Sequence, residues 1–186
     1  MSRSPIVVDA SAAIALIRRE PGWPALAEVL HVSAQEAVRL LSPEALWLEI
    51  VNVLVRRYGL PPSEVVEGLR EMDDLGIDSV RLDRPLLLVT IDLQARFGLS
   101  AYDAAYLALA ETEDARLLTL DRQLFRAAGA RAIRLPGVGD GRFSEEPAAY
   151  GEPVDWARFG AYLARLRAEA RATADSHHLT GGVTAP

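Results

Sequence analysis

Apolar and polar positions follow a regular pattern over the first 135 residues, where short apolar runs alternate with longer segments of helical period. Ile6, Val7 and Val8 form a β-branched, wholly apolar run, which is typical of a central strand in a parallel sheet. The segment 36–41 fits neither period clearly. Further strands are expected at 77–82, 116–120 and 131–135, and helices at 12–18, 23–32, 44–58, 61–75, 84–97, 104–110 and 122–127. This alternation predicts an α/β domain with a parallel sheet.

The segment 99–124 organises the rest of the chain. Its Ala- and Leu-rich run at 104–110 predicts a buried helix lying flat on the sheet, because small side chains allow close approach. Asp103 stands at the start of that helix, and Asp121 follows the next strand. Both carboxylates are therefore expected at one edge of the parallel sheet, where open α/β sheets bind ligands. Taken singly, each acid is also explained as part of a helix cap, with Ser100 and Asp103 forming a capping box.

Two further acids stand at notable positions. Asp9 directly follows the first apolar run, where it or Ser11 can cap the next helix. Glu49 lies inside a helix that is apolar almost all round, where it has no capping role. Glu49, Asn52 and Arg56 are spaced i, i+3 and i+7 and form one stripe. That stripe is either a narrow face exposed to solvent or a place where the Glu49 carboxylate meets a donor or a metal.

The amino-acid composition limits the kinds of site and partner that the chain can have. The chain contains no Cys and no Lys, so all 20 basic residues are Arg, and neither a disulfide nor a thiolate metal site is possible. The net charge of −6 by itself argues against a nucleic-acid partner. Within residues 1–135, however, 19 acids face 15 Arg residues, and setting four acids aside as metal ligands leaves 15 of each. A bound metal would remove the electrostatic penalty locally.

The chain is expected to hold one domain, residues 1–137, and an extension, residues 138–186. The extension reads as a loop rich in Gly, Pro and acids, an amphipathic helix at about 155–174 and a disordered end. The N-terminal segment is a poor signal peptide, because Asp9 interrupts its short apolar stretch. No apolar run is long enough to span a bilayer. A soluble, cytoplasmic protein is therefore expected.

Four acids now stand at element ends or inside an apolar helix: Asp9, Glu49, Asp103 and Asp121. Clustered carboxylates repel one another and have raised pKa values unless a divalent cation neutralises them. Ligation by oxygen alone selects Mg²⁺ or Mn²⁺ over zinc. Such an ion suits phosphodiester hydrolysis, because it lowers the pKa of an attacking water and stabilises charge on the phosphate. The sequence leaves open whether one ion or two would bind.

The segments VVDASAAIALI, EIVNVL, LSAYDAAYLALA and LLTLDRQL together resemble the PIN-domain family, and most closely its VapC-like toxin ribonucleases. The resemblance covers roughly residues 5–136 in chain order. It implies a Rossmann-like α/β/α sandwich with a central parallel sheet, and a Mg²⁺- or Mn²⁺-dependent endoribonuclease acting on RNA. It further implies a homodimer and a cognate antitoxin as protein partner. Carried over, the metal-binding and catalytic acids are Asp9, Glu49, Asp103 and Asp121, flanked by the polar positions Ser11, Asn52 and Thr119.

Other functions are compatible with parts of this pattern. VapC-like toxins usually stop near the position of Leu135, so a PIN nuclease that processes RNA outside a toxin–antitoxin system is the alternative. Phosphoaspartyl chemistry also places an Asp at a strand end with Mg²⁺. It relies on a Lys, however, as does a P-loop NTPase, and this chain has none. A catalytically inactive PIN scaffold is disfavoured, because all four acids are present.

Overall fold

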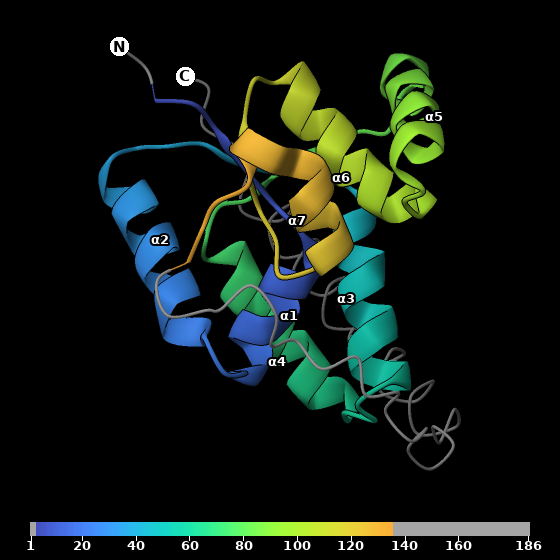
Figure 1. The fold of residues 1–186 in the computed structure, drawn as a ribbon. Coiled ribbons are helices and arrows are strands. Elements are labelled where there is room, and N and C mark those ends of the chain that lie inside the picture. The colour runs from blue at the N-terminus through green and yellow to red at the C-terminus, as the bar shows by residue number, and fades with distance from the viewer. Residues whose placement is uncertain (1–2, 136–186) are drawn as a thin grey trace, which may run out of the picture.

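A computed structural model describes residues 3–135 of the chain (Figure 1). The extension expected at 138–186, with its helix at about 155–174, lies outside the described residues. The elements in chain order are β1 (Ile6–Val8), α1 (Ala10–Arg18), α2 (Trp23–Gln35), β2 (Leu40–Pro43), α3 (Ala45–Arg56), α4 (Pro62–Asp73), β3 (Asp78–Val80), α5 (Arg84–Phe97), α6 (Ala101–Thr112), β4 (Arg116–Leu118), α7 (Arg122–Ala128) and a 3₁₀ turn, η1 (Gly129–Arg131). None of the helices in this described part is both long enough and apolar enough to cross a membrane.

The four strands form one parallel sheet in the order β3-β2-β1-β4. β1 is central and buried at all three positions, as its apolar run predicts. The chain builds outward from β1 to β2 and β3, and then returns to place β4 on the other side of β1. The strand order thus reverses between β1 and β4. In open α/β sheets, ligands bind outside the carboxyl ends of the strands at such a reversal.

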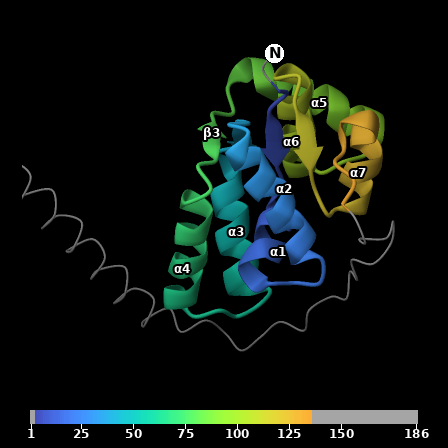
Figure 2. The same ribbon diagram turned by 90° about the vertical axis from the view of Figure 1, so that its left-hand side faces the viewer.

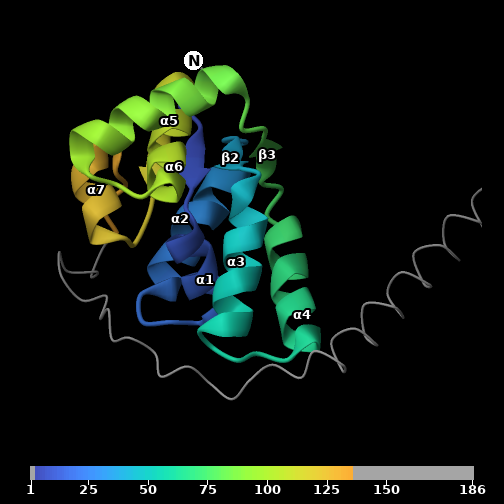
Figure 3. The same ribbon diagram turned by 90° about the vertical axis from the view of Figure 1, so that its right-hand side faces the viewer.

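Helix α6 covers the sheet, packing against β1, β2 and β4. Every residue from Ala104 to Ala110 is buried, which confirms the buried helix predicted from the Ala- and Leu-rich run. Helix α5 packs on α6 and lies over it in Figure 3. Helix α1 contacts α2, α3 and α4, and Figure 1 shows α2 and α3 on either side of it. Figure 2 shows α3 and α4 side by side.

The structure differs from the sequence analysis at two strands. The sequence predicts no strand at β2, because a four-residue run ending in Pro43 is too short to show a period. Its polar residue Ser42 is nevertheless buried, since its hydroxyl donates to the Val8 carbonyl at 2.9 Å. The strand predicted at 131–135 is wrong. Gly129 has a φ of 55°, and the chain turns into η1, leaving a single parallel bridge between Leu117 and Ala132.

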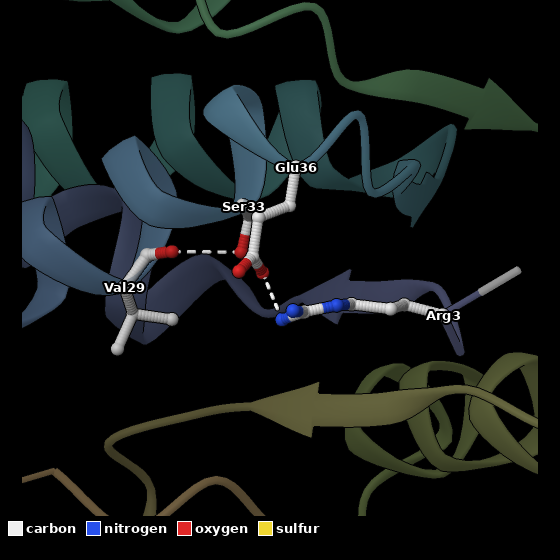
Figure 4. A network of polar contacts seen from close by, with 4 residues as sticks. All are labelled: Arg3, Val29, Ser33 and Glu36. Carbon is white, nitrogen blue, oxygen red and sulfur yellow. Dashed lines mark hydrogen bonds and ion pairs between the residues drawn. The ribbon is translucent and has the colours of Figure 1, made fainter.

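The segment before β1 is connected to the end of α2. Arg3 forms an ion pair with Glu36, beside Ser33, whose hydroxyl donates to the Val29 carbonyl at 2.7 Å (Figure 4). An ion pair with exposed partners contributes little to stability. The ion pair lies at the amino edge of the sheet, opposite the carboxyl edge where Asp9 follows β1. It is therefore separate from the end of the sheet where ligands are expected.

Candidate active site

Asp9 is a buried carboxylate at the carboxyl end of the central strand. Its side chain is 3% exposed and caps α1 by accepting from the Ser11 backbone N–H at 3.3 Å. It also accepts from the hydroxyls of Ser11 and Thr119, the latter at 2.7 Å. Its backbone N–H donates to the Leu118 carbonyl at 3.0 Å, so the ends of β1 and β4 are held together. Burial of a carboxylate is tolerated here because donors surround it.

Ser11 and Thr119 connect the start of α1 to the loop that follows β4. Their hydroxyl oxygens are 3.3 Å apart. The Ser11 oxygen accepts from the Leu120 backbone N–H at 2.9 Å, and the Thr119 oxygen accepts from that of Asp121 at 3.0 Å. These two flanking residues therefore contact the Asp9 carboxylate directly. Asn52, the third flanking residue predicted, lies exposed on α3.

Glu49 reaches the same region from α3. It is half-buried, and its Oε2 accepts a 2.7 Å hydrogen bond from the hydroxyl of Tyr106, a wholly buried residue of α6. Asn52 and Arg56, by contrast, are exposed. The predicted stripe is thus divided: its later part faces solvent, while Glu49 turns inward to a donor.

Asp103 and Asp121 take part in helix caps, as the simpler explanation of each acid predicts. Ser100 caps α6 by accepting from the Asp103 backbone N–H at 3.1 Å, and its hydroxyl donates to Asp103 Oδ2 at 2.6 Å. Asp121 Oδ1 accepts from the Leu124 backbone N–H at 2.6 Å and caps α7. Each of these contacts uses one oxygen of its carboxylate. A capping role is therefore compatible with a second role for the other oxygen.

Three of the acids interact electrostatically. Burial raises the pKa of Asp9 to about 6, the nearby charge of Asp103 adds to the rise, and hydrogen bonds from Ser11 and Thr119 oppose it. Burial raises the pKa of Glu49 to about 7, against the Tyr106 hydrogen bond and with help from the charges of Asp9 and Asp103. Asp9, Glu49 and Asp103 therefore form one coupled cluster. Asp121 is connected to Asp9 through its backbone, because its N–H donates to Thr119 Oγ1 and the Thr119 hydroxyl donates to Asp9.

The donor set fits a hard divalent cation. It consists of carboxylates and hydroxyls, which are the ligands of Mg²⁺ and Mn²⁺. A dication would stabilise the ionised forms of Asp9 and Glu49, whose pKa values are raised first by burial and then by neighbouring charges. Within residues 3–135, no three or more Asp, Glu or His side chains lie together so that they could hold a metal ion, so this part of the chain has no ready cage of protein ligands. Instead, the carboxylates of Glu49, Asp103 and Asp121 each face a hydrogen-bond donor of their own. Mg²⁺ commonly takes one or two carboxylates and keeps several waters, so it does not require such a cage.

Comparison with known proteins decides the family. Residues 6–130 match the model of the PIN domain. The chain belongs to the PIN-domain family. This match confirms the predicted family and fold. PIN domains are nucleases that generally depend on divalent metals.

Solved structures share the PIN fold at low identity. The VapC20 toxin of Mycobacterium tuberculosis, described as cleaving the sarcin–ricin loop, has a TM-score of 0.54 at 16% identity, over 67% of this chain and 95% of that one. A toxin–antitoxin complex from Klebsiella pneumoniae gives 0.50 at 17%, over 69% and 96%. A protein of Pyrobaculum aerophilum gives 0.51 at 25%, over 69% and 82%. A search of curated proteins finds no match.

Sequence reasoning missed one residue of this candidate site, Tyr106. It stands within the Ala- and Leu-rich run of α6 and reads as one more apolar residue facing the core. The available signal was its hydroxyl, because a buried Tyr usually needs a hydrogen-bond partner. That partner is Glu49, the acid that the sequence left without a capping role.

Proposed function

We propose that this PIN domain is a metal-dependent endoribonuclease that hydrolyses phosphodiester bonds in RNA. The observation that carries the proposal is the coupled cluster of Asp9, Glu49 and Asp103, placed where the strand order reverses between β1 and β4. Asp121, whose backbone N–H donates to Thr119 Oγ1, would complete the set of acids that hold the cation. When bound, Mg²⁺ or Mn²⁺ supplies an acidified water and charge stabilisation at the phosphate.

The residues of this chain would divide the work. Ser11 and Thr119 hold the Asp9 carboxylate in place and favour its ionised form, because both donate to it. Asp103 and Asp121 contribute carboxylate oxygens from the first turn of α6 and from the start of α7. Arg56 lies exposed, two helical turns beyond Glu49 on α3, where its guanidinium can bind an RNA phosphate. Asn52 lies between them and can donate to the same strand.

We further propose that the chain is a toxin, acts as a homodimer and is inhibited by a cognate antitoxin. Support comes from the toxin–antitoxin complexes among the proteins of similar fold. Large apolar side chains are also exposed on the described surface: Leu88 and Ile91 on α5 are 60% exposed, and Leu48 on α3 is 75% exposed. Exposed apolar side chains that lie together favour contact with another protein, and Leu88 and Ile91, spaced i and i+3, share one face of α5. An RNA-processing nuclease outside a toxin–antitoxin system would share the site and differ in its partner.

Incubating the purified chain with a long structured RNA tests the activity. We expect fragments with internal ends when Mg²⁺ or Mn²⁺ is supplied and intact RNA in excess EDTA. RNA that stays intact under both conditions would favour the inactive scaffold. For the toxin assignment, the chain is expressed in cells with and without a small reading frame found directly upstream of its gene. Growth arrest that the small protein relieves supports the toxin, and normal growth in both cases supports the RNA-processing alternative.

A further inference from the structure

The Tyr106 hydroxyl connects α6 to α3 at the acidic cluster. Tyr106 is 0% exposed, and its ring is fixed among the buried residues of α6 that pack on the sheet. Its hydroxyl donates a hydrogen bond of 2.7 Å to Glu49 Oε2. A phenol carries its proton at neutral pH, so the hydroxyl of Tyr106 is the donor in this hydrogen bond.

A glutamate needs such a contact to hold one orientation. Its side chain has several rotatable bonds, and fixing them costs conformational entropy. Glu49 is half-buried on a helix whose later polar residues, Asn52 and Arg56, face solvent. A bond from a rigid buried donor selects the inward orientation and leaves Oε1 as the oxygen available to a cation.

We propose that Tyr106 is a positioning residue, whose hydroxyl holds Glu49 Oε2 so that the other carboxylate oxygen faces the divalent-cation site. This inference rests on the proposed function and deepens it. Residues that hydrogen-bond to a metal ligand orient it, and losing one typically lowers metal affinity 10- to 100-fold.

The chain offers a matched control in a second Tyr–Glu pair. The Tyr58 hydroxyl donates to Glu20 Oε1 at 2.9 Å, where Tyr58 follows the end of α3 and Glu20 follows α1. Neither residue interacts with Asp9, Glu49 or Asp103 in the described contacts. Tyr58→Phe therefore removes a bond of the same chemistry without touching the acidic cluster.

The experiment is a calorimetric titration of Mn²⁺ into the metal-free full chain. We expect Tyr106→Phe to weaken Mn²⁺ binding about 10-fold or more and Tyr58→Phe to bind as the wild type does. In a Glu49→Ala background, adding Tyr106→Phe should cause no further loss, because the residue acts through Glu49. Wild-type affinity in Tyr106→Phe would overturn the proposal. So would an equal loss in both backgrounds.

Thermal unfolding without metal shows whether Tyr106→Phe remains folded, since Phe keeps the ring and its packing. If Tyr106→Phe does not fold, the Mn²⁺ titration is carried out with Glu49→Asp instead. That variant keeps the charge but is one methylene too short to keep this hydrogen bond, and wild-type Mn²⁺ affinity there would overturn the proposal. The two proposals fail differently. Wild-type protein that binds Mn²⁺ and leaves RNA intact would contradict the ribonuclease, whereas Tyr106→Phe with full Mn²⁺ affinity contradicts the positioning role.

Discussion

Thr119 Oγ1 donates a 2.7 Å hydrogen bond to Asp9 Oδ2 across 110 positions of sequence. Both residues are buried, and they follow the two adjacent strands between which the strand order reverses. The same Thr119 oxygen accepts from the Asp121 backbone N–H at 3.0 Å. One hydroxyl therefore connects the first and the last of the four predicted acids.

Thr119→Val keeps the shape of this side chain and removes its hydroxyl. We expect the free energy of unfolding to fall by about 1–3 kcal/mol, because Asp9 and the Asp121 N–H each lose a buried partner. RNA cleavage should fall about 10- to 100-fold as Asp9 loses its orientation. Thr90→Val is the control, since Thr90 is equally buried but donates to the Leu86 carbonyl within α5. Equal cleavage rates in the two variants would show that Thr119 has only a structural role.

Asp103→Asn separates a ligand from a cap. The amide oxygen can still accept from Ser100, so the loss of cap stability should be a few tenths of a kcal/mol and at most about 1. Losing the charge also relieves repulsion on Asp9 and Glu49, so the metal-free variant should melt no lower than the wild type. Cleavage should nevertheless fall by orders of magnitude. Asp92→Asn is the control, because Asp92 is exposed on α5 and pairs with Arg96. Wild-type turnover in Asp103→Asn would return Asp103 to a capping role.

The raised pKa values of Asp9, about 6, and Glu49, about 7, predict a pH dependence of stability. Both ordinary values lie near 4, so between pH 4 and 7 the folded metal-free protein holds more protons than the unfolded chain. The contribution of these groups to stability is therefore complete below about pH 4 and is lost as the pH rises past 7. For the buried Asp9 alone it is on the order of 1–3 kcal/mol.

Denaturant unfolding in EDTA from pH 5 to pH 8 measures this dependence. The wild type is compared with the double variant Asp9→Asn/Glu49→Gln, in which neither group titrates. We expect the stability of the wild type relative to the variant to decrease with pH. Adding Mn²⁺ should stabilise the wild type more at pH 8 than at pH 5, because protons compete with the ion. A relative stability that rises with pH would contradict the coupled cluster.

Arg56→Ala tests whether RNA passes along α3. We expect binding of a single-stranded RNA to weaken, and the slope of log K against log salt to become smaller by about 0.7 for one lost phosphate contact. Binding is measured in the Asp103→Asn background so that the RNA stays intact. Arg70→Ala is the control, because Arg70 is an exposed residue of α4 that pairs with Glu67. An unchanged salt slope in Arg56→Ala would place the RNA elsewhere.

Local patterns predicted much of this PIN domain. The run before Asp9 gave the central strand, and the Ala-rich run gave α6, because in both cases burial depends on neighbouring residues in the sequence. The prediction failed where tertiary contacts decide. β2 is too short to show a period, and its Ser42 is buried only because the Val8 carbonyl accepts its hydroxyl. The strand expected at 131–135 is prevented by the turn at Gly129.

In the candidate site, too, local patterns predicted some features and tertiary contacts decided others. Asp9, Asp103 and Asp121 stand at the ends of predicted elements, so the sequence alone picks them out as candidates. The structure shows that all three also take part in helix caps. The hydrogen bond between Glu49 and Tyr106 joins two helices, and the two residues are 57 positions apart in the sequence. No local pattern therefore predicts that they meet. Predicting it would have required the packing of α6 over the sheet beside α3. The metal-binding roles of the four acids remain predictions.

The most direct test of a metal-dependent ribonuclease compares metal binding with cleavage in one preparation. Mn²⁺ is titrated into the metal-free chain, and at each step both the bound metal and the initial rate of RNA cleavage are measured. We expect the rate to rise in parallel with occupancy and to return to zero when EDTA removes the ion, and we expect Asp9→Asn to lack both binding and cleavage. Cleavage that persists in EDTA, or full Mn²⁺ occupancy without any cleavage, would contradict the account.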